Sequence, residues 1–593
     1  MMNSGVAIRY GDVAPEAKEN FKPTSDSAKF DTLAQLQQYN LNFPNYANPC
    51  ELYQTVLDGT ASAFPSIPEQ SNLGLWSEQL SKDDGTFTEP IVLTLTSEGQ
   101  YSSQGLTFTF DTYNQIYPTH INIKWFRYAG GTMTELSPDG GVDFYPDNAF
   151  YFCRKQVENY NKVVITFYSL NMPKNRLKLR VIDYGYGTFF YGDELRGVKL
   201  IQEIDPISTE ISINTADFTL DSKSDMEYSF QAKQPLSVYF NGELKATTFV
   251  KKSTRKAKRL WSIQSEDYIG LMDSIPYYGG IYTNKNAVEL LTDIFTVAKV
   301  PYNIDDVFAN AVVTGYIPFT TCRDALMQVA FAIQAVVDTS NSEVVKIFAL
   351  EEDVKQTIPL NRIMQGQNFS DDETVTGVEV AVHTYKPITE TMDVYDATES
   401  GTGQNILVKF SEPLHDLSIT NGSFAIDDKG NELKYTNYAV INANVGCILQ
   451  GQKYEHTTQT RRKNNLVVLA SEIEKVISVE SATLVSAYNI DNVIEKCYNW
   501  LIKTNQTNLK IVEGKHVQYG GAVKWGDKKW GDFKWGEFKW GEKTPNIITY
   551  DQSVNVGENI NAETEYLGVV SGRLIKQTFN LNGNIIIKEA VLK

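Results

Sequence analysis

Cysteine and histidine, the residue types most used for metal and redox chemistry, are scarce in this chain. It has five of each among 593 residues. The cysteines are scattered, form no Cys-x-x-Cys pair and are odd in number, which argues against a disulfide framework and indicates folding in a reducing cytoplasm. The histidines show none of the His-x-His or His-Glu-x-x-His spacings typical of zinc sites. The sequence therefore predicts no metal site and no cofactor, and each histidine is interpreted as a surface or hydrogen-bonded residue.

Long apolar runs and an excess of positive charge are also missing. No stretch approaches the ~18 apolar residues of a membrane span, and the first residues lack the pattern of a signal peptide, so we expect neither a membrane span nor ordinary secretion. The formal net charge is −18, which argues against nucleic-acid binding because such binding needs a positive face to release counterions. One basic run, residues 251–259, is interpreted as an exposed hairpin between two strands, with contact to an acidic neighbouring subunit as the alternative.

Catalytic signatures are absent as well. The chain has no Gly-x-Ser-x-Gly elbow and no phosphate-binding Gly-x-x-x-x-Gly-Lys loop. Adjacent carboxylates such as Asp83–Asp84 and Asp371–Asp372 could serve a glycosidase, but such pairs are expected by chance among 72 acidic residues and both lie in turn-like sequence. The sequence therefore predicts no catalytic residue and favours a protein that is not an enzyme.

The chain is rich in short segments typical of β-strands. Its length suggests about four domains. Between residues 72 and 184, runs such as 91–96 (IVLTLT), 121–126 (INIKWF) and 163–168 (VVITFY) alternate with Gly, Asn, Asp and Pro turns, which predicts a β-sandwich. Trp125 lies in an alternating run and is predicted to pack in its core.

Helical periodicity is confined to a few places. Residues 286–299 and 320–336 have apolar residues at helical spacing and precede a strand at 344–350, which predicts a small α/β unit. A further helix is predicted at 490–505. The fold class predicted is mainly β with a small α/β part.

A repeat of period five interrupts this pattern. Residues 524–543 read KWGDKKWGDFKWGEFKWGEK, a period that fits neither a strand nor a helix. We interpret it as an exposed loop with stacked indole rings. Two roles remain open, an interface anchor inside an assembly, which we favour, and a sugar-binding surface. The candidate ligand-binding or interface residues are Trp525, Trp530, Trp535 and Trp540.

Most of the chain beyond residue 190 resembles the tail (baseplate) hub proteins of phages and prophages of Gram-positive bacteria. The most specific stretch is GYIPFTTCRDALMQVAFAIQAVVDTS at 315–340, whose Gly-x-Ile-Pro, Cys-Arg-x-Ala-Leu and Val-Asp-Thr-Ser elements keep the family's order. The WSIQSEDYIGLMD stretch at 261–273 and the C-terminal strands add to it. The region 72–184 is similar to discoidin-like and carbohydrate-binding modules, with GLWS at 74–77 and YPTHINIKWF at 117–126.

The resemblance implies a structural subunit of a phage-type tail tip, with no enzymatic activity. Its expected partners are two further copies in a homotrimer, the tail tube, other baseplate or tail-tip proteins, and host cell-wall carbohydrate. The expected location is the tail of a virion or phage-like particle, assembled in the host cytoplasm and released by lysis. The alternative is a tail-associated cell-wall hydrolase, a glycosidase or peptidase. The predicted organisation is an N-terminal extension (1–71), the β-sandwich (72–184), a first hub β-barrel domain (190–272), a small α/β hub domain (273–358), a second hub β domain with a helix (359–515), the Trp-Gly insertion (516–545) and closing strands (546–593).

Overall fold

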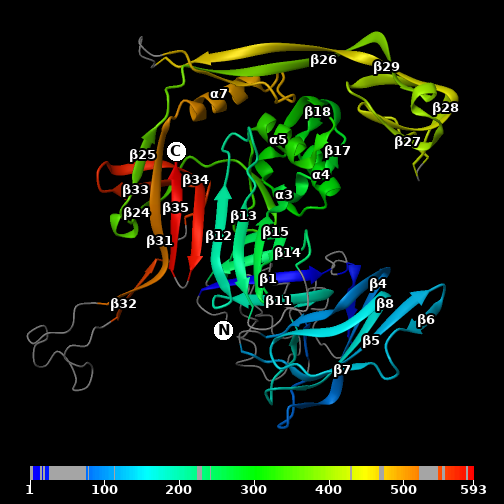
Figure 1. Ribbon diagram of the computed structural model, residues 1–593, viewed down its shortest axis with the longest axis vertical. Helices are drawn as coiled ribbons and strands as arrows, with labels where there is room; N and C mark the ends of the chain where they lie inside the picture. The colour runs from blue at the N-terminus through cyan, green and yellow to red at the C-terminus, as the bar shows by residue number, and fades with distance from the viewer. Residues whose placement is uncertain are drawn as a thin grey trace, which may run out of the picture.

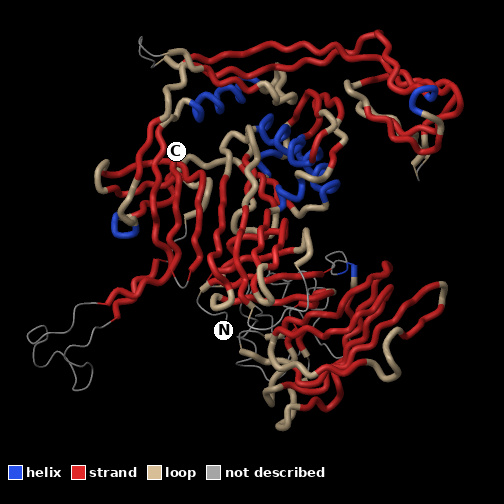
Figure 2. Tube along the Cα trace, in the orientation of Figure 1, coloured by secondary structure: helices blue, strands red, loops and turns tan. Residues whose placement is uncertain are grey.

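The computed structural model confirms a mainly β protein with few helices (Figures 1 and 2). It describes residues 5–13, 17, 20–25, 75–77, 79–111, 114–179, 181–222, 230–240, 242–427, 430–466, 473–519, 545–550, 554–582 and 585–593. In Figure 1 a β-sandwich lies below a large central sheet, a small α/β unit lies beside the upper part of that sheet, and a long two-stranded ribbon crosses the top. None of the helices in these ranges is long and apolar enough to cross a bilayer.

The sandwich is built on two long, bent strands that pair with each other. Its main sheet has the order β10-β4-β8-β5-β6, with β2 on β4 and β7 on β5. Trp125 is fully buried among the core residues, which confirms its predicted position. Phe21, far from the sandwich in sequence, packs in the same core. The strands are β2 (Lys22–Thr24), β3 (Leu75–Trp76), β4 (Thr86–Thr109), β5 (Pro118–Ala129), β6 (Thr132–Glu135), β7 (Val142–Phe144), β8 (Phe150–Leu170), β9 (Lys178–Leu179) and β10 (Val181–Asp183).

The first half of the central sheet begins at the N-terminus and continues after the sandwich. Strand β1 (Val6–Val13) pairs antiparallel with β11 (Gly185–Tyr191), and Val13 faces Gly185. The sandwich is thus inserted between two paired strands, which the sequence analysis did not foresee. The basic run 251–259 lies at the exposed end of the β15–β16 hairpin, as predicted. The remaining strands are β12 (Leu195–Glu203), β13 (Thr215–Asp221), β14 (Pro235–Phe240), β15 (Glu243–Arg255) and β16 (Leu260–Glu266).

The second half of the central sheet is formed largely by the C-terminal strands. It joins the first half edge to edge, because β12 pairs with β34 from Val198–Leu581 to Glu203–Lys576. The Lys576 ammonium lies 2.7 Å from the Glu203 carboxylate across this seam. The elements are β24 (Val354–Ile358), the 3-10 helix η4 (Leu360–Arg362), β25 (Asn368–Asp371), β31 (Asn505–Tyr519), β32 (Pro545–Tyr550), β33 (Asn559–Thr564), β34 (Gly568–Asn582) and β35 (Ile585–Leu592).

The α/β unit packs two helices over short strands, close to the predicted ranges. In α4 the Asn286 side chain accepts hydrogen bonds from the Val288 and Glu289 amides, so it satisfies two of the amides left unpaired at a helix start. Helices α4 and α5 contribute apolar side chains to one core. The elements are α3 (Tyr268–Met272), β17 (Pro276–Tyr277), β18 (Gly280–Asn286), α4 (Ala287–Ala298), β19 (Tyr302–Ile304), η3 (Asp306–Phe308), β20 (Val312–Ile317), β21 (Thr320–Thr321), α5 (Cys322–Ile333), β22 (Val336–Asp338) and β23 (Val345–Phe348).

The long ribbon carries a small tip unit with its own core. Strands β26 and β29 pair over most of their length, and β27, β28 and α6 complete the tip. Asn437, just before β29, donates to the carbonyls of Tyr278 (2.6 Å) and Ile317 (2.9 Å), so the tip docks back on the α/β unit. Helix α7 confirms the helix predicted near residue 490. The elements are β26 (Gly377–Asp396), α6 (Ala397–Ser400), β27 (Gly403–Lys409), β28 (Leu414–Phe424), β29 (Tyr438–Asn464), β30 (Val476–Val479) and α7 (Ile490–Leu501).

Candidate functional site

Trp525, Trp530, Trp535 and Trp540 lie outside the described residues. The candidate site is therefore built from the structure alone. It is the junction where the two halves of the central sheet meet the α/β unit.

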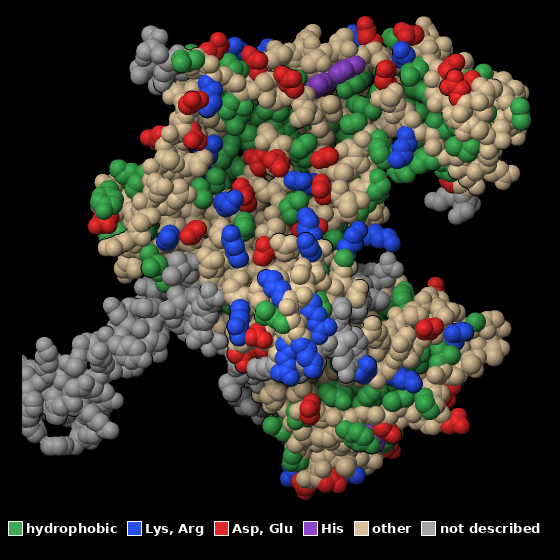
Figure 3. All heavy atoms as spheres, viewed as in Figure 1, with side chains coloured by type: hydrophobic (Ala, Val, Ile, Leu, Met, Phe, Trp, Pro, Cys, Tyr) green, Lys and Arg blue, Asp and Glu red, His purple; other side chains and the backbone are tan. Residues whose placement is uncertain are grey.

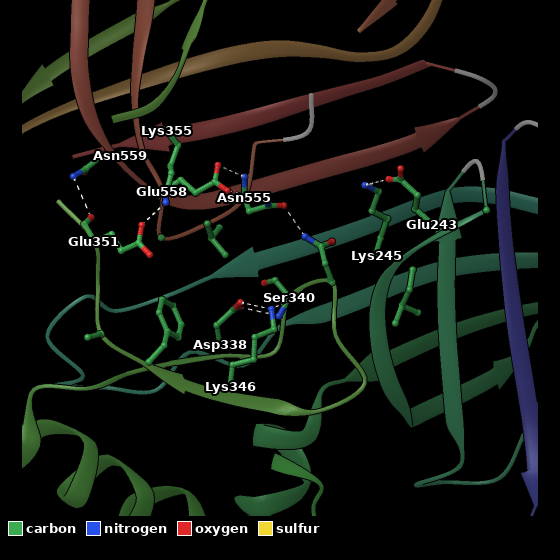
Figure 4. Close-up of a pocket in the computed structure, with 17 residues that line it drawn as sticks. Glu243, Lys245, Asp338, Ser340, Lys346, Glu351, Lys355, Asn555, Glu558 and Asn559 are labelled. Atoms are coloured by element: carbon green, nitrogen blue, oxygen red, sulfur yellow. Dashed lines mark hydrogen bonds and ion pairs between the residues drawn. The ribbon is translucent and has the colours of Figure 1, made fainter. Parts of the chain in front are cut away.

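A cavity of about 610 Å³ lies at this junction (Figure 4). Three separate segments line it. They are the turn into β15 (242–245), the stretch from the end of β22 to the start of β24 (338–355), and the turn before β33 (555–559). The first comes from one sheet half, the second runs from the α/β unit, and the third comes from the other sheet half. The cavity is therefore a meeting point of all three units.

The lysines that line this cavity have carboxylate partners. Lys245, whose side chain is 8% exposed, lies 2.9 Å from Glu243. Lys346 lies 3.3 Å from Asp338 and donates to the Ser340 carbonyl at 2.7 Å. A third pair, Lys355 with Glu351, is exposed. In each of these two pairs one partner is buried, Lys245 or Asp338, and the other, Glu243 or Lys346, reaches solvent, so pairing offsets the cost of burying a charge in the cavity wall.

Amide side chains connect the walls across the cavity. Asn341, from the α/β side, donates to the Asn555 side chain of the second sheet half at 2.8 Å. Asn555 in turn donates to Glu558 at 3.0 Å. The backbone N–H of Asn341 also donates to the Lys245 backbone carbonyl of the first sheet half at 3.2 Å. A single loop thus bonds to both halves of the sheet.

A second buried cluster lies beside this loop. Asp267 caps α3 by accepting from the amides of Ile269 and Gly270. Its other oxygen accepts from the Thr339 hydroxyl at 2.6 Å and from the Asn214 amide at 3.1 Å. Burial raises the pKa of Asp267 to about 6, against the opposing effect of these hydrogen bonds. The cluster ties the first sheet half to the α/β unit.

Arg323 provides a further tie at the start of α5. Its guanidinium donates twice to the Ile211 carbonyl, at 2.6 and 3.0 Å. Asp273 and Glu210 lie 3.3 and 3.4 Å away. The fixed fork of an arginine suits this role, because it can bond several acceptors at once.

The motifs behind the family resemblance therefore coincide with these ties. Asp338, Thr339 and Ser340 belong to the Val-Asp-Thr-Ser element, and Arg323 belongs to Cys-Arg-x-Ala-Leu. Sequence reasoning found these motifs but not the roles of Thr339 and Arg323, because Thr339 bonds to Asp267, 72 positions away, and Arg323 bonds to Ile211, 112 positions away.

Two histidines meet at the base of the ribbon. The ring nitrogens of His383 and His456 lie 2.9 Å apart, and the second nitrogen of His383 lies 3.1 Å from the Glu480 carbonyl. Burial, the main cause, lowers the pKa of His383. Both are hydrogen-bonded histidines, as predicted. Among the described residues there is no cluster of three or more potential metal-ligating side chains.

No protein-family model and no curated protein matches the sequence. The structure is similar to three solved tail proteins. One is the 43 kDa tail protein of prophage MuSo2 from Shewanella oneidensis, with 8% identity, a TM-score of 0.37, and 67% of this chain and 97% of that chain covered. The second, from Neisseria meningitidis MC58, has 10% identity, a TM-score of 0.38, and coverage of 69% and 93%. The third, a prophage tail protein from Listeria monocytogenes EGD-e, has 11% identity, a TM-score of 0.34, and coverage of 68% and 91%.

Proposed function

We propose that this chain is the structural hub subunit of a phage-type tail tip or baseplate, in a particle that infects or attacks a Gram-positive host. In this role it joins the tail tube to the tip. The observation that carries the proposal is the use of the family's motif residues. Thr339 and Arg323 bond the α/β unit to the first half of the central sheet, and Asp338 pairs with Lys346 inside the α/β unit. Motif side chains that hold the fold together in this way support a structural role for the protein.

The assembled form we propose is a homotrimer. The central sheet is open, and the edge strand at one end of its strand order is β25, which has four residues. Open sheet edges carry unpaired backbone groups that are commonly covered by neighbouring chains. The basic hairpin end adds a charged surface, and Figure 3 shows Lys and Arg side chains gathered over the central part of the molecule. Acidic patches on a neighbouring copy would complement this basic surface, since the whole chain has a formal net charge of −18.

Light scattering on the full chain tests the trimer. The expected result is a trimer, either alone or with the tail-tube subunit added. Replacing Lys256 and Lys258 with Glu is expected to weaken association, because the new carboxylates would repel the acidic side chains of the neighbouring copy. A monodisperse monomer in both samples would contradict the proposal.

Within the particle, the sandwich is proposed to contact host cell-wall glycans. Its position supports this role, because it projects from the central sheet on one side (Figure 1). The rival proposal is a tail-associated hydrolase. Incubating the full chain with purified host cell wall separates the two, since a hydrolase releases reducing ends or free amines and a hub protein does not.

A further inference from the structure

A cluster of aromatic and polar side chains lies on the outer face of the sandwich. Strand β5 pairs with β7 on one side and β8 on the other, with Asn122 opposite Asp143 and His120 opposite Ser169. The alternate residues Ile121 and Ile123 point into the core. Since successive side chains of a strand point to opposite faces, the residues between them lie on the outer face. We call this group the Tyr145 cluster; it consists of His120, Asn122, Asp143, Tyr145 and Tyr168.

The three rings of the cluster form a ladder across neighbouring strands. The His120 ring lies 4.4 Å from the Tyr168 ring and 5.1 Å from the Tyr145 ring, nearly parallel to both. Tyr145 is the outermost ring and is 65% exposed. One face of its phenol stacks on His120, and the exposed fraction leaves ring surface in contact with solvent. A rigid aromatic face is therefore presented at the edge of the sheet.

Polar groups of defined orientation lie beside this ring. The same oxygen of Asp143 accepts from His120 at 2.9 Å and from the Asn122 side chain at 3.0 Å. These hydrogen bonds, the one from Asn122 first, lower the pKa of Asp143, so its carboxylate is ionised at neutral pH. The carboxylate is half exposed, and its second oxygen can accept from a ligand hydroxyl. His120 donates to the carboxylate through Nε2, which fixes the orientation of its ring beside Tyr145.

We propose that the Tyr145 cluster binds a neutral pyranose unit of a cell-wall glycan. A pyranose has an apolar C–H face, which packs against the exposed Tyr145 ring surface, and a rim of hydroxyls, which donate to Asp143. The Asp143 carboxylate disfavours acidic sugars by repulsion between like charges. This inference rests on the glycan contact in the proposed function and specifies its site and ligand class.

Saturation-transfer NMR on the full chain tests the site. The probes are the methyl glycosides of glucose, galactose, rhamnose and N-acetylglucosamine, with methyl glucuronide as the acidic and methyl glucosaminide as the cationic comparison. We expect transfer to at least one neutral glycoside and none to the glucuronide. Tyr145→Ala is expected to weaken binding about tenfold or more, because the stacking surface is removed.

Two further variants make the result specific. Tyr145→Phe keeps the ring and is expected to bind as the unchanged chain does. Tyr128→Ala is the matched control, because Tyr128 lies in β5 outside the cluster and is 56% exposed.

Three results would overturn the inference. They are no transfer to any neutral glycoside, binding of the cationic glycoside alone, and equal binding by Tyr145→Ala and the unchanged chain. In the last case the glycan contact stands and only its location is wrong. The hub role is judged separately, by whether the same variants still form trimers and enter tails.

Discussion

The ion pair between Arg9 and Asp183 ties the sandwich to the central sheet, and its removal is a direct test of how the two are coupled. Arg9 lies in β1 of the central sheet, and Asp183 is the last residue of β10 in the sandwich. Their side chains are 16% and 4% exposed. Burial lowers and Asp183 raises the pKa of Arg9, with a net rise. The Asp183 carboxylate therefore stabilises the positive charge of the buried Arg9 guanidinium.

The substitution Asp183→Asn keeps the shape of the side chain but removes the carboxylate paired with Arg9, and leaves Glu343 as the other carboxylate that raises the pKa of Arg9. Removing one partner of a buried pair costs about 3–5 kcal/mol, and the residual exposure of Arg9 favours the lower end, about 3 kcal/mol. At 1.4 kcal/mol per factor of ten, this corresponds to about 100-fold faster exchange of the β1 and β11 amides if they open together. Hydrogen–deuterium exchange with peptide-level mass spectrometry measures it.

Arg9→Met in the same chain removes the unpaired charge and is expected to restore most of the protection. Asp83→Asn is the matched control, because the Asp83–Lys174 pair is almost fully exposed, and it is expected to change nothing measurable. Unchanged exchange in Asp183→Asn would refute the coupling. Equal losses in the single and double variants would show that the charge is not the cause.

Three further predictions follow from other parts of the chain. Because the pKa of Asp267 is raised from 3.8 to about 6, the folded chain holds a proton between these pH values that the unfolded chain releases. The contribution of Asp267 to the free energy of unfolding therefore falls by about 3 kcal/mol as pH rises from about 4 to 6. Urea unfolding of the wild-type chain and of Asp267→Asn should show stabilities that diverge by this amount over that range, and a difference independent of pH would contradict the prediction. Replacing residues 14–184 with an Asn-Gly turn, together with Arg9→Met, should leave a chain that still forms trimers. The reason is that Val13 and Gly185 are already paired and that such a turn suits adjacent antiparallel strands. Aggregation or loss of the trimer, measured by light scattering, would show that the sandwich supports the sheet. Replacing Trp530 and Trp535 with Ala should weaken tail assembly by a few kcal/mol if they anchor a subunit contact; normal tails that no longer bind cell-wall sugar would favour the sugar-binding role instead.

Local patterns predicted the elements whose signals lie within a few residues. Helices α4 and α5 were expected from apolar spacing, and both begin at a capping side chain, Asn286 and Thr321. The sandwich strands were expected from alternation, and Trp125 lies in the core as predicted. In each case the periodicity of the sequence reports directly on which side chains are buried.

Pairings between distant segments could not be predicted in the same way. Nothing near Val6–Val13 indicates that it pairs with strands beginning at Gly185 and Pro235. The Tyr145 cluster was missed for the same reason. His120 and Tyr168 are 48 positions apart, and only strand register brings their rings together. Such contacts depend on register, and a one-residue shift would move each side chain to the opposite face.

The insertion of the sandwich between β1 and β11 has a consequence for how this module can be exchanged. Both ends of the inserted segment meet at one pair of facing residues, Val13 and Gly185. A gene segment encoding a different surface module can therefore be exchanged at these two points by recombination, while the strands on either side keep their spacing. If the sandwich contacts the host as we propose, attachment to a new host can evolve in the inserted module, and the central sheet, whose strands must pair with one another, stays unchanged.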